Sequence, residues 1–255
     1  MLVFITSLRH PRNCTSYKQV LLILENSLRS ICNQNASDYE VIVVCNEIPS
    51  LQFSHAKIHY VKVDFPPPSD IQGSEIGIEA IRLDRGAKYL IGLLFAKRFS
   101  PTHSMFVDAD DFVSNRIAGF VSEHRNDPGW YVSEGYIYSA GSNEIGILKR
   151  FNANCGSCYI VRYLLYTIPA ETRLDMSREE IVNIAGEDYI YKFLGSHKFV
   201  LQNLAEKGVT LQPLPFMGAV YHVGHSQNWS GDRTFDEIPR IGLTRPVREE
   251  FYLPE

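Results

Sequence analysis

Ser104-Met105-Phe106-Val107-Asp108-Ala109-Asp110-Asp111 is the stretch of sequence that decides the fold. Its apolar half predicts a buried strand, and three carboxylates follow within four residues. These charges repel one another at the end of a buried strand, so the arrangement is costly unless a cation compensates them. An extended chain directs Asp108 and Asp110 the same way, which predicts a divalent-cation site that holds phosphates. The alternative is an acidic turn that caps the following helix.

Apolar runs and helical patterns alternate on the N-terminal side of this stretch. Strands separated by helices indicate βαβ units and a parallel sheet, so the predicted fold class is α/β with a mostly parallel central sheet. Ligands of such sheets bind beyond the carboxyl ends of the strands, where the Asp108–Asp111 segment lies. The strands are predicted at 2–7, 40–45, 58–63 and 104–107, and the helices at 17–30 and 74–96, with a break near Gly86.

The pattern changes after Ser114. We still expect a single domain over 1–255, since we find no internal repeat and no low-complexity segment. The predicted elements of this part are a strand at 130–139, a turn at 141–143, a polar loop at 151–157 and a helix at 177–194.

Composition narrows the functional classes. The chain has 255 residues, 45% of them apolar, and a formal net charge of -4, so no basic excess favours nucleic acid as a partner. Five scattered cysteines do not suggest a disulfide framework, and the C-x-x-C of Cys155 and Cys158 lacks the second pair of a zinc site. The N-terminal apolar run is too short for a signal peptide, and no stretch approaches the roughly 18 apolar residues of a membrane span. We therefore expect a cytoplasmic protein without a transmembrane segment, with peripheral membrane association left open.

The βαβ order, the strand-borne D-x-D and its distance from the start resemble glycosyltransferases of the GT-A fold, a Rossmann-like fold of nucleotide-diphospho-sugar transferases. The likeness is to family 2-like and β-1,4-galactosyltransferase-like enzymes. It implies a nucleotide-sugar donor, a saccharide or other glycan acceptor, and Mn²⁺ or Mg²⁺ as cofactor. It also implies a nucleotide-sugar-binding half at 1–114, and an acceptor-side half with a C-terminal metal-ligand loop at 115–255. Asp108 would face the ribose or the metal and Asp110 would bind the metal, while the role of Asp111 stays open.

Gly186-Glu187-Asp188 is similar to the G-E-D segment of inverting enzymes of this fold. The resemblance makes Asp188 the general base that deprotonates the acceptor hydroxyl, because direct displacement needs a base opposite the leaving diphosphate. The role of Glu187 stays open. The alternative is an acidic first helical turn, favoured by the helix dipole.

His222-Val223-Gly224-His225 resembles the C-terminal loop from which GT-A enzymes complete their metal site. Imidazole is an acceptable ligand for Mn²⁺ beside carboxylates, and we favour His225 over His222. Surface histidines on a turn are the alternative.

Weaker resemblances complete the predicted donor site. Arg82 and Lys88 are alternatives to Arg85 as the basic residue near the donor phosphates, and Trp229 is either an acceptor-stacking or a packing residue. Besides Asp108, the predicted donor contacts are Thr6, Ser7, Arg9, Asn46, Arg85 and Asn154.

The predicted function is therefore metal-dependent, inverting glycosyl transfer in polysaccharide or glycoconjugate synthesis. One rival is a nucleotidyltransferase of related α/β fold, which usually has a glycine-rich loop after the first strand; here that loop, 7–11, contains no glycine. The others are an inactive sugar-binding relative, and a phosphatase, whose D-x-D belongs on the first strand.

Overall fold

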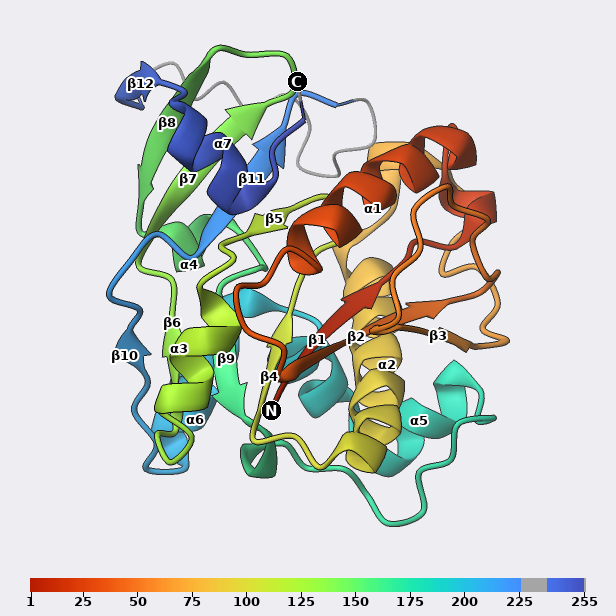
Figure 1. Cartoon of the computed structure of the whole chain (residues 1–255). Helices are drawn as coiled ribbons and strands as arrows, with labels where there is room; N and C mark the ends of the chain where they lie inside the picture. Colours follow the sequence, from red (N-terminus) through yellow and green to blue (C-terminus); the bar gives the residue numbers. More distant parts are fainter. Residues whose placement is uncertain (226–237, 255) are drawn as a thin grey trace.

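The computed structural model describes residues 1–225 and 238–254, in which two β-sheets are surrounded by helices (Figure 1). The larger sheet has seven strands in the order β10-β6-β9-β4-β1-β2-β3. Among these described strands β9 runs opposite to the others, so the predicted α/β class with a mostly parallel sheet is confirmed. The strands are β1 (Leu2–Ser7), β2 (Tyr39–Cys45), β3 (Ile58–Lys62), β4 (His103–Phe106), β6 (Gly129–Tyr131), β9 (Tyr159–Arg162) and β10 (Gln212–Pro213).

Two long helices connect the parallel strands. Helix α1 (Tyr17–Ile31) begins where the Ser16 side chain accepts a hydrogen bond from the backbone N–H of Gln19. Helix α2 (Ile78–Ala96) packs against β1 and β2. The predicted break near Gly86 is wrong, because Gly86 lies inside α2. Glycine at this position allows close packing, because a Cβ there would collide with the carbonyl of Ile190.

The second sheet has five strands in the order β12-β8-β7-β11-β5. Its apolar side holds a separate small core that includes Phe112, Tyr138 and Val220, and Phe251 of helix α7 (Arg245–Phe251) packs into it. The sequence analysis did not predict this sheet. Its strands are β5 (Phe112–Val113), β7 (Glu134–Ser139), β8 (Glu144–Lys149), β11 (Ala219–Val223) and β12 (Arg240–Gly242).

The strand predicted at 130–139 is two strands in different sheets, β6 and β7. β6 has only three residues and two residues separate it from β7, so periodicity alone does not reveal where the chain leaves one sheet for the other. The predicted turn at 141–143 is confirmed and joins β7 to β8, with Gly141 at a φ of +79°.

The remaining helices are short. The predicted polar loop at 151–157 begins with helix α4 (Phe151–Asn154). The helix predicted at 177–194 is α5 (Arg178–Ala185) followed by a π-helical segment, Tyr189–Leu194, because Gly186 ends α5 at a φ of +87°. The others are α3 (Ile117–Glu123), α6 (Val200–Glu206) and 3₁₀ turns at Pro11–Asn13, Gly73–Glu75, Lys97–Phe99, Tyr163–Leu165 and His197–Phe199.

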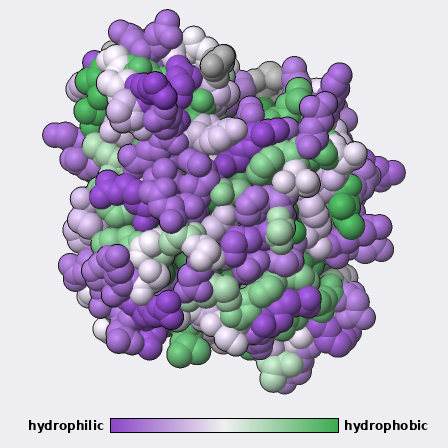
Figure 2. Space-filling view, viewed as in Figure 1, coloured by the Kyte–Doolittle hydropathy of each residue, from purple (hydrophilic) through white to green (hydrophobic). Residues whose placement is uncertain are grey.

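The surface in Figure 2 is mostly hydrophilic, with apolar residues scattered among polar ones. All five cysteines are free thiols, as expected. No helix within 1–225 and 238–254 is long and apolar enough to cross a membrane.

Candidate functional site

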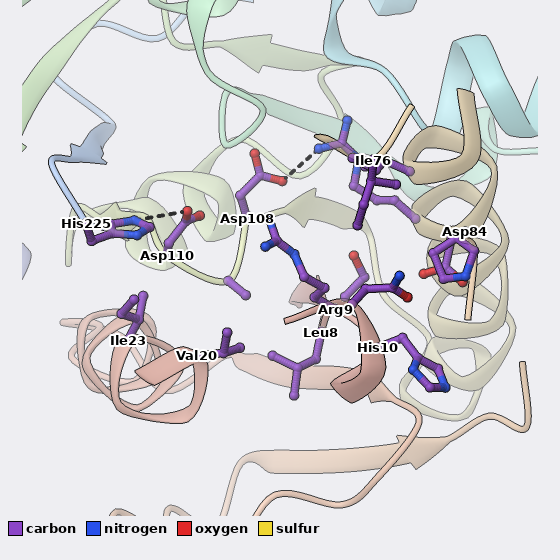
Figure 3. Close-up of a pocket in the computed structure, with 16 residues that line it drawn as sticks. Leu8, Arg9, His10, Val20, Ile23, Ile76, Asp84, Asp108, Asp110 and His225 are labelled. Atoms are coloured by element: carbon purple, nitrogen blue, oxygen red, sulfur yellow. Dashed lines mark hydrogen bonds and ion pairs between the residues drawn. The ribbon is translucent and has the colours of Figure 1, made fainter. Parts of the chain in front are cut away.

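The Asp108–Asp111 turn lies directly after β4, at the carboxyl end of the parallel strands. The N–H of Asp111 donates to the carbonyl of Asp108 at 3.2 Å and closes the turn. Asp108 and Asp110 face a cleft that the loop after β1 borders on the other side (Figure 3). A second cleft opens on the opposite side of the same two carboxylates, towards α4 and residues 196–198. The turn therefore forms the floor that the two clefts share.

Asp108 is held by a cation from α2. The Nη1 of Arg85 lies 3.2 Å from its Oδ1, and the same guanidinium donates through Nε to the carbonyl of Gly195 at 3.1 Å. Burial raises the pKa of Asp108, and the charge of Arg85 opposes that shift. Arg85 thus anchors one carboxylate of the pair and connects it to the segment after residue 194.

Asp110 faces the C-terminal loop. Its Oδ2 lies 3.3 Å from the Nε2 of His225, and Figure 3 shows the two side chains facing each other. Burial favours the neutral carboxyl, but the hydrogen bond and charge of His225, helped by His222 and Arg9, hold the pKa of Asp110 below its ordinary value. His222 contacts the same residue differently: its Nδ1 lies 3.1 Å from the backbone carbonyl of Asp110. Burial, then the charge of His225, lowers the pKa of His222 to about 4.

Asp111, whose role the sequence left open, connects three segments. It is 1% exposed, and its carboxylate accepts from the Cys155 thiol at 3.0 Å, the Ser157 hydroxyl at 2.6 Å and the N–H of His222 at 3.1 Å. Burial, with the charges of Asp110 and Asp108, raises its pKa well above the ordinary range. Asp111 therefore fixes the turn to β11 and to the loop after α4, and does not face the cleft.

The loop after α4 closes on the turn. Ser157 accepts a hydrogen bond from the N–H of Asp108 at 2.9 Å, and a Cβ at Gly156 would collide with the Asp108 carboxylate. Asn154 lines the second cleft and donates to the carbonyl of Arg150 at 3.1 Å. The small-residue loop Asn154-Cys155-Gly156-Ser157 was predicted to line the donor site, with Asn154 as the contact; that Ser157 holds the turn was not predicted.

The residues predicted after β1 and β2 separate into two groups. Ser7 and Arg9 line the first cleft. Thr6 is 1% exposed and Asn46 is 8% exposed, and neither belongs to the lining of the described clefts. Asn46 donates to the carbonyl of Phe65 at 2.9 Å and so fixes the loop after β3.

The two alternatives to Arg85 lie apart. Lys88 is buried, and its ammonium group donates to the carbonyl of Leu8 at 2.8 Å and to the carboxylate of Asp84 at 2.7 Å. These contacts fix the position of the loop after β1. Arg82 lines the second cleft.

The Gly186–Asp188 segment lies outside the cleft lining. The Asp188 side chain is 82% exposed and pairs with Lys192 at 2.8 Å. Three residues after Asp188, the hydroxyl of Tyr191 accepts a hydrogen bond from the Nη1 of Arg82, a lining residue of the second cleft, at 2.9 Å. Trp229, the predicted acceptor-stacking residue, lies outside the described residues.

The donors at the turn fit a divalent cation in part. Asp110 and His225 offer a carboxylate and an imidazole side by side, whereas Asp108 is engaged by Arg85. No group of three His, Cys, Asp or Glu side chains in 1–225 and 238–254 is arranged to hold a metal. Two protein donors are sufficient for Mg²⁺-type ions, which usually keep waters and take further ligands from a substrate phosphate.

No protein-family model and no curated protein matches the chain. The structure is similar to Staphylococcus aureus TarS 1–349 in complex with UDP-GlcNAc, with 11% identity over 91% of this chain and 61% of that chain and a TM-score of 0.45. It is also similar to the glycosyltransferase GlyE of Streptococcus pneumoniae TIGR4 (12% identity, 99% of this chain, 60% of that chain, TM-score 0.35). A third is HddC of Yersinia pseudotuberculosis (10% identity, 99% and 97%, TM-score 0.37). The chain thus spans about three fifths of the TarS and GlyE chains, and the residues of the clefts carry the functional proposal.

Proposed function

We propose that this protein is a divalent-metal-dependent glycosyltransferase of the GT-A type, which transfers a sugar from a nucleotide-diphosphate sugar to an acceptor hydroxyl. The single observation that carries the proposal is the pairing at the shared floor of the clefts. There Asp110 faces His225 at 3.3 Å and Asp108 faces Arg85 at 3.2 Å, directly after a parallel strand. A diphosphate needs both cationic charge and metal ligands, and this floor offers an arginine beside a carboxylate–imidazole pair.

Asp110 and His225 would hold Mn²⁺ or Mg²⁺. When bound, such an ion supplies the positive charge that stabilises a departing diphosphate. Arg9 borders the first cleft and already lowers the pKa of Asp110 by its charge, so it stands where it contacts a nucleotide phosphate or ribose. Arg85 keeps Asp108 in place and limits the negative charge that an incoming anion meets.

In this proposal Asp188 is the base that takes the proton from the acceptor hydroxyl. In direct displacement the acceptor oxygen bonds to the anomeric carbon while the bond from that carbon to the diphosphate oxygen breaks, and the hydroxyl proton passes to a base. The exposed Asp188 carboxylate is open to an acceptor that arrives from solvent. The π-helical segment that follows Asp188 contacts Arg82 of the second cleft through Tyr191. One displacement without a covalent intermediate inverts the anomeric configuration.

The decisive experiment is incubation with Mn²⁺ and a panel of nucleotide sugars, followed by identification of the products. We expect slow release of free sugar and nucleoside diphosphate, which stops in EDTA and returns with Mn²⁺ or Mg²⁺. Full activity in chelator would overturn the metal assignment. Cleavage at phosphorus, seen as nucleoside monophosphate and sugar 1-phosphate, would instead identify a nucleotidyl-group enzyme.

A matched pair of variants ties the activity to the floor of the clefts. Asp110→Ala removes a carboxylate from the proposed site, whereas Asp175→Asn alters one that is 81% exposed and pairs with Arg173 at 3.2 Å. We expect loss of activity in the first and normal activity in the second. Equal activity in both would exclude Asp110 from the reaction.

A further inference from the structure

The second cleft has a wall that the proposed reaction does not use. It consists of residues 195–198, which pack against the turn of α2 that carries Arg82 and Arg85. The packing is close, since a Cβ at Gly195 would collide with the backbone carbonyl of Arg82, and Arg85 donates to the carbonyl of Gly195. Four side chains of this region line the cleft: Arg82, Ser196, His197 and Lys198. We call these four side chains the 196–198 wall with Arg82.

Two cations of this wall have no carboxylate partner in the part of the chain that the structure describes. Arg82 donates to the Tyr191 hydroxyl and lies over the rings of Tyr191 and Phe199, at 5.1 and 5.8 Å from their centroids. Neither Arg82 nor Lys198 forms an ion pair within residues 1–225 and 238–254. By contrast, Arg85 in the same cleft is paired with Asp108. Within residues 1–225 and 238–254, this wall of the cleft thus holds two positive charges that no ion pair compensates.

Polar atoms without partners accompany these charges. The Nε of Arg82, the Oγ of Ser196 and both ring nitrogens of His197 are buried and lack a well-formed hydrogen bond in the described parts of the chain. Ser196 is 2% exposed and still borders the cleft. Buried donors are normally satisfied, and each one left unsatisfied destabilises the fold. A ligand with several acceptor oxygens would satisfy the Nε of Arg82, the hydroxyl of Ser196 and the one ring nitrogen of His197 that carries a proton.

We propose that the 196–198 wall with Arg82 binds an oxyanion, a phosphate or carboxylate, carried by the glycosyl acceptor. This inference deepens the proposed function and rests on it, because it assumes that the donor occupies the first cleft beyond Asp110. Cations beside neutral donors are the usual recognition elements for such groups. The acceptor is then an acidic molecule that carries a phosphate or carboxylate group. The other source of the same chemistry is the donor's own diphosphate.

A pair of probes that differ only in the oxyanion tests this: glycerol 1-phosphate and glycerol. Their binding to the full chain is measured by calorimetry or ligand-observed NMR, with and without Mn²⁺ and a nucleoside diphosphate. We expect the phosphate ester to bind at least about tenfold more tightly than glycerol, because charge-assisted hydrogen bonds are the strong ones. Equal binding of the two probes would overturn the proposal.

Variants test whether the phosphate probe binds at this wall or at the site of the donor's diphosphate. Lys198→Gln and Arg82→Gln should each weaken glycerol 1-phosphate at least about fivefold, with nucleoside diphosphate affinity unchanged. Lys198→Arg should restore binding, and Lys149→Gln, an exposed cation on β8, should have no effect. Lys198 is itself exposed, so its variant tests the site even if Arg82→Gln fails to fold. Parallel weakening of the nucleoside diphosphate would show that the anion is the donor's, which overturns the acceptor assignment.

The two proposals fail separately. Probe binding needs no turnover, so phosphate-selective binding that depends on Lys198 supports the anion site even if no nucleotide sugar is ever cleaved, in which case the proposed function falls alone. Cleavage of a nucleotide sugar without any preference for the phosphate ester would support the proposed function and overturn the anion site.

Discussion

Two acidic motifs stand out in this chain, and the structure treats them differently. The Asp108–Asp111 turn is enclosed: Arg85, His225 and a network around Asp111 fix each of its three carboxylates. The Gly186–Asp188 segment is open, with Asp188 82% exposed and paired with the neighbouring Lys192. The first motif is part of the architecture of the clefts, whereas the second lies at the end of a short helix.

The difference separates two kinds of functional carboxylate. A group that holds a metal and a diphosphate must keep its position against repulsion from its neighbours, which requires fixed partners. A group that takes a proton from an acceptor needs access and the right pKa more than burial. The turn has the properties of the first kind, and Asp188 is suited only to the second. Each of the following experiments tests this division.

The broadest effect is expected for Asp110→Asn, which should weaken nucleotide binding as well as turnover. The amide keeps the shape but loses the charge that faces His225, so a nucleoside diphosphate with Mn²⁺ should bind at least about tenfold more weakly. Turnover should fall by roughly 10²–10³-fold, the usual cost of removing one preorganised electrostatic group. Calorimetric titration and product release measure the two quantities. Unchanged nucleotide affinity would mean that the enclosed turn is not the diphosphate site.

Asp188→Asn should separate turnover from binding. Loss of a general base costs about 10²–10⁴-fold in rate, whereas nucleoside diphosphate affinity with Mn²⁺ should stay near wild type, because Asp188 does not line the donor cleft. The same two assays apply. Turnover within a fewfold of wild type would return Asp188 to the role of a helix-start residue and remove the main argument for inversion.

The first half of the fold could be predicted from the sequence because it is built from local signals. The strand predicted at 2–7 coincides with β1, and the strand predicted at 40–45 and the helix predicted at 17–30 match β2 and α1 to within one residue. The five-stranded sheet could not be predicted in this way. Its strands β7 and β11 are distant in sequence, and β5 is only two residues long. Such pairing is decided by the tertiary packing around Phe112 and Phe251, which no periodicity encodes.

For the site, the sequence could identify residue types but not their partners. The D-x-D after a strand identified Asp108 and Asp110 as candidates, and the loop at 222–225 identified His225. Each of these motifs is a short contiguous stretch, so it can be recognised in the sequence. It could not distinguish Ser7 in the cleft from Thr6 beneath it, since neighbours on a strand point to opposite faces and only the structure tells which face is open. The partners of Asp111 come from residues 155–157 and 222, 44 to 111 positions away.

Stability gives an intermediate effect. Asp111→Ala leaves the buried donors of Cys155, Ser157 and His222 without an acceptor, so the free energy of unfolding should fall by roughly 2–4 kcal/mol. Asp188→Ala, on the open motif, should leave the melting temperature nearly unchanged. Chemical denaturation of the metal-free protein compares the two variants directly. Similar small effects of both would show that the network around Asp111 does not stabilise the turn.

The smallest expected effect concerns pH and His197, on the cleft wall beyond the turn. Burial, then the charges of Arg85, Lys198 and Arg82, lowers its pKa to about 4, and the backbone of Ala153 opposes this shift. Because the pKa is lower in the folded than in the unfolded chain, protons bind preferentially to the unfolded state between about pH 6.5 and 4, and stability falls as the pH falls through that window. His197→Gln removes this contribution, so its loss of unfolding free energy from pH 7 to pH 5 should be about 1–2 kcal/mol smaller than that of wild type. Denaturant titrations at the two pH values measure the difference. The same pH dependence in variant and wild type would mean that His197 is as open to solvent as Asp188, and that the wall beside the turn is not enclosed.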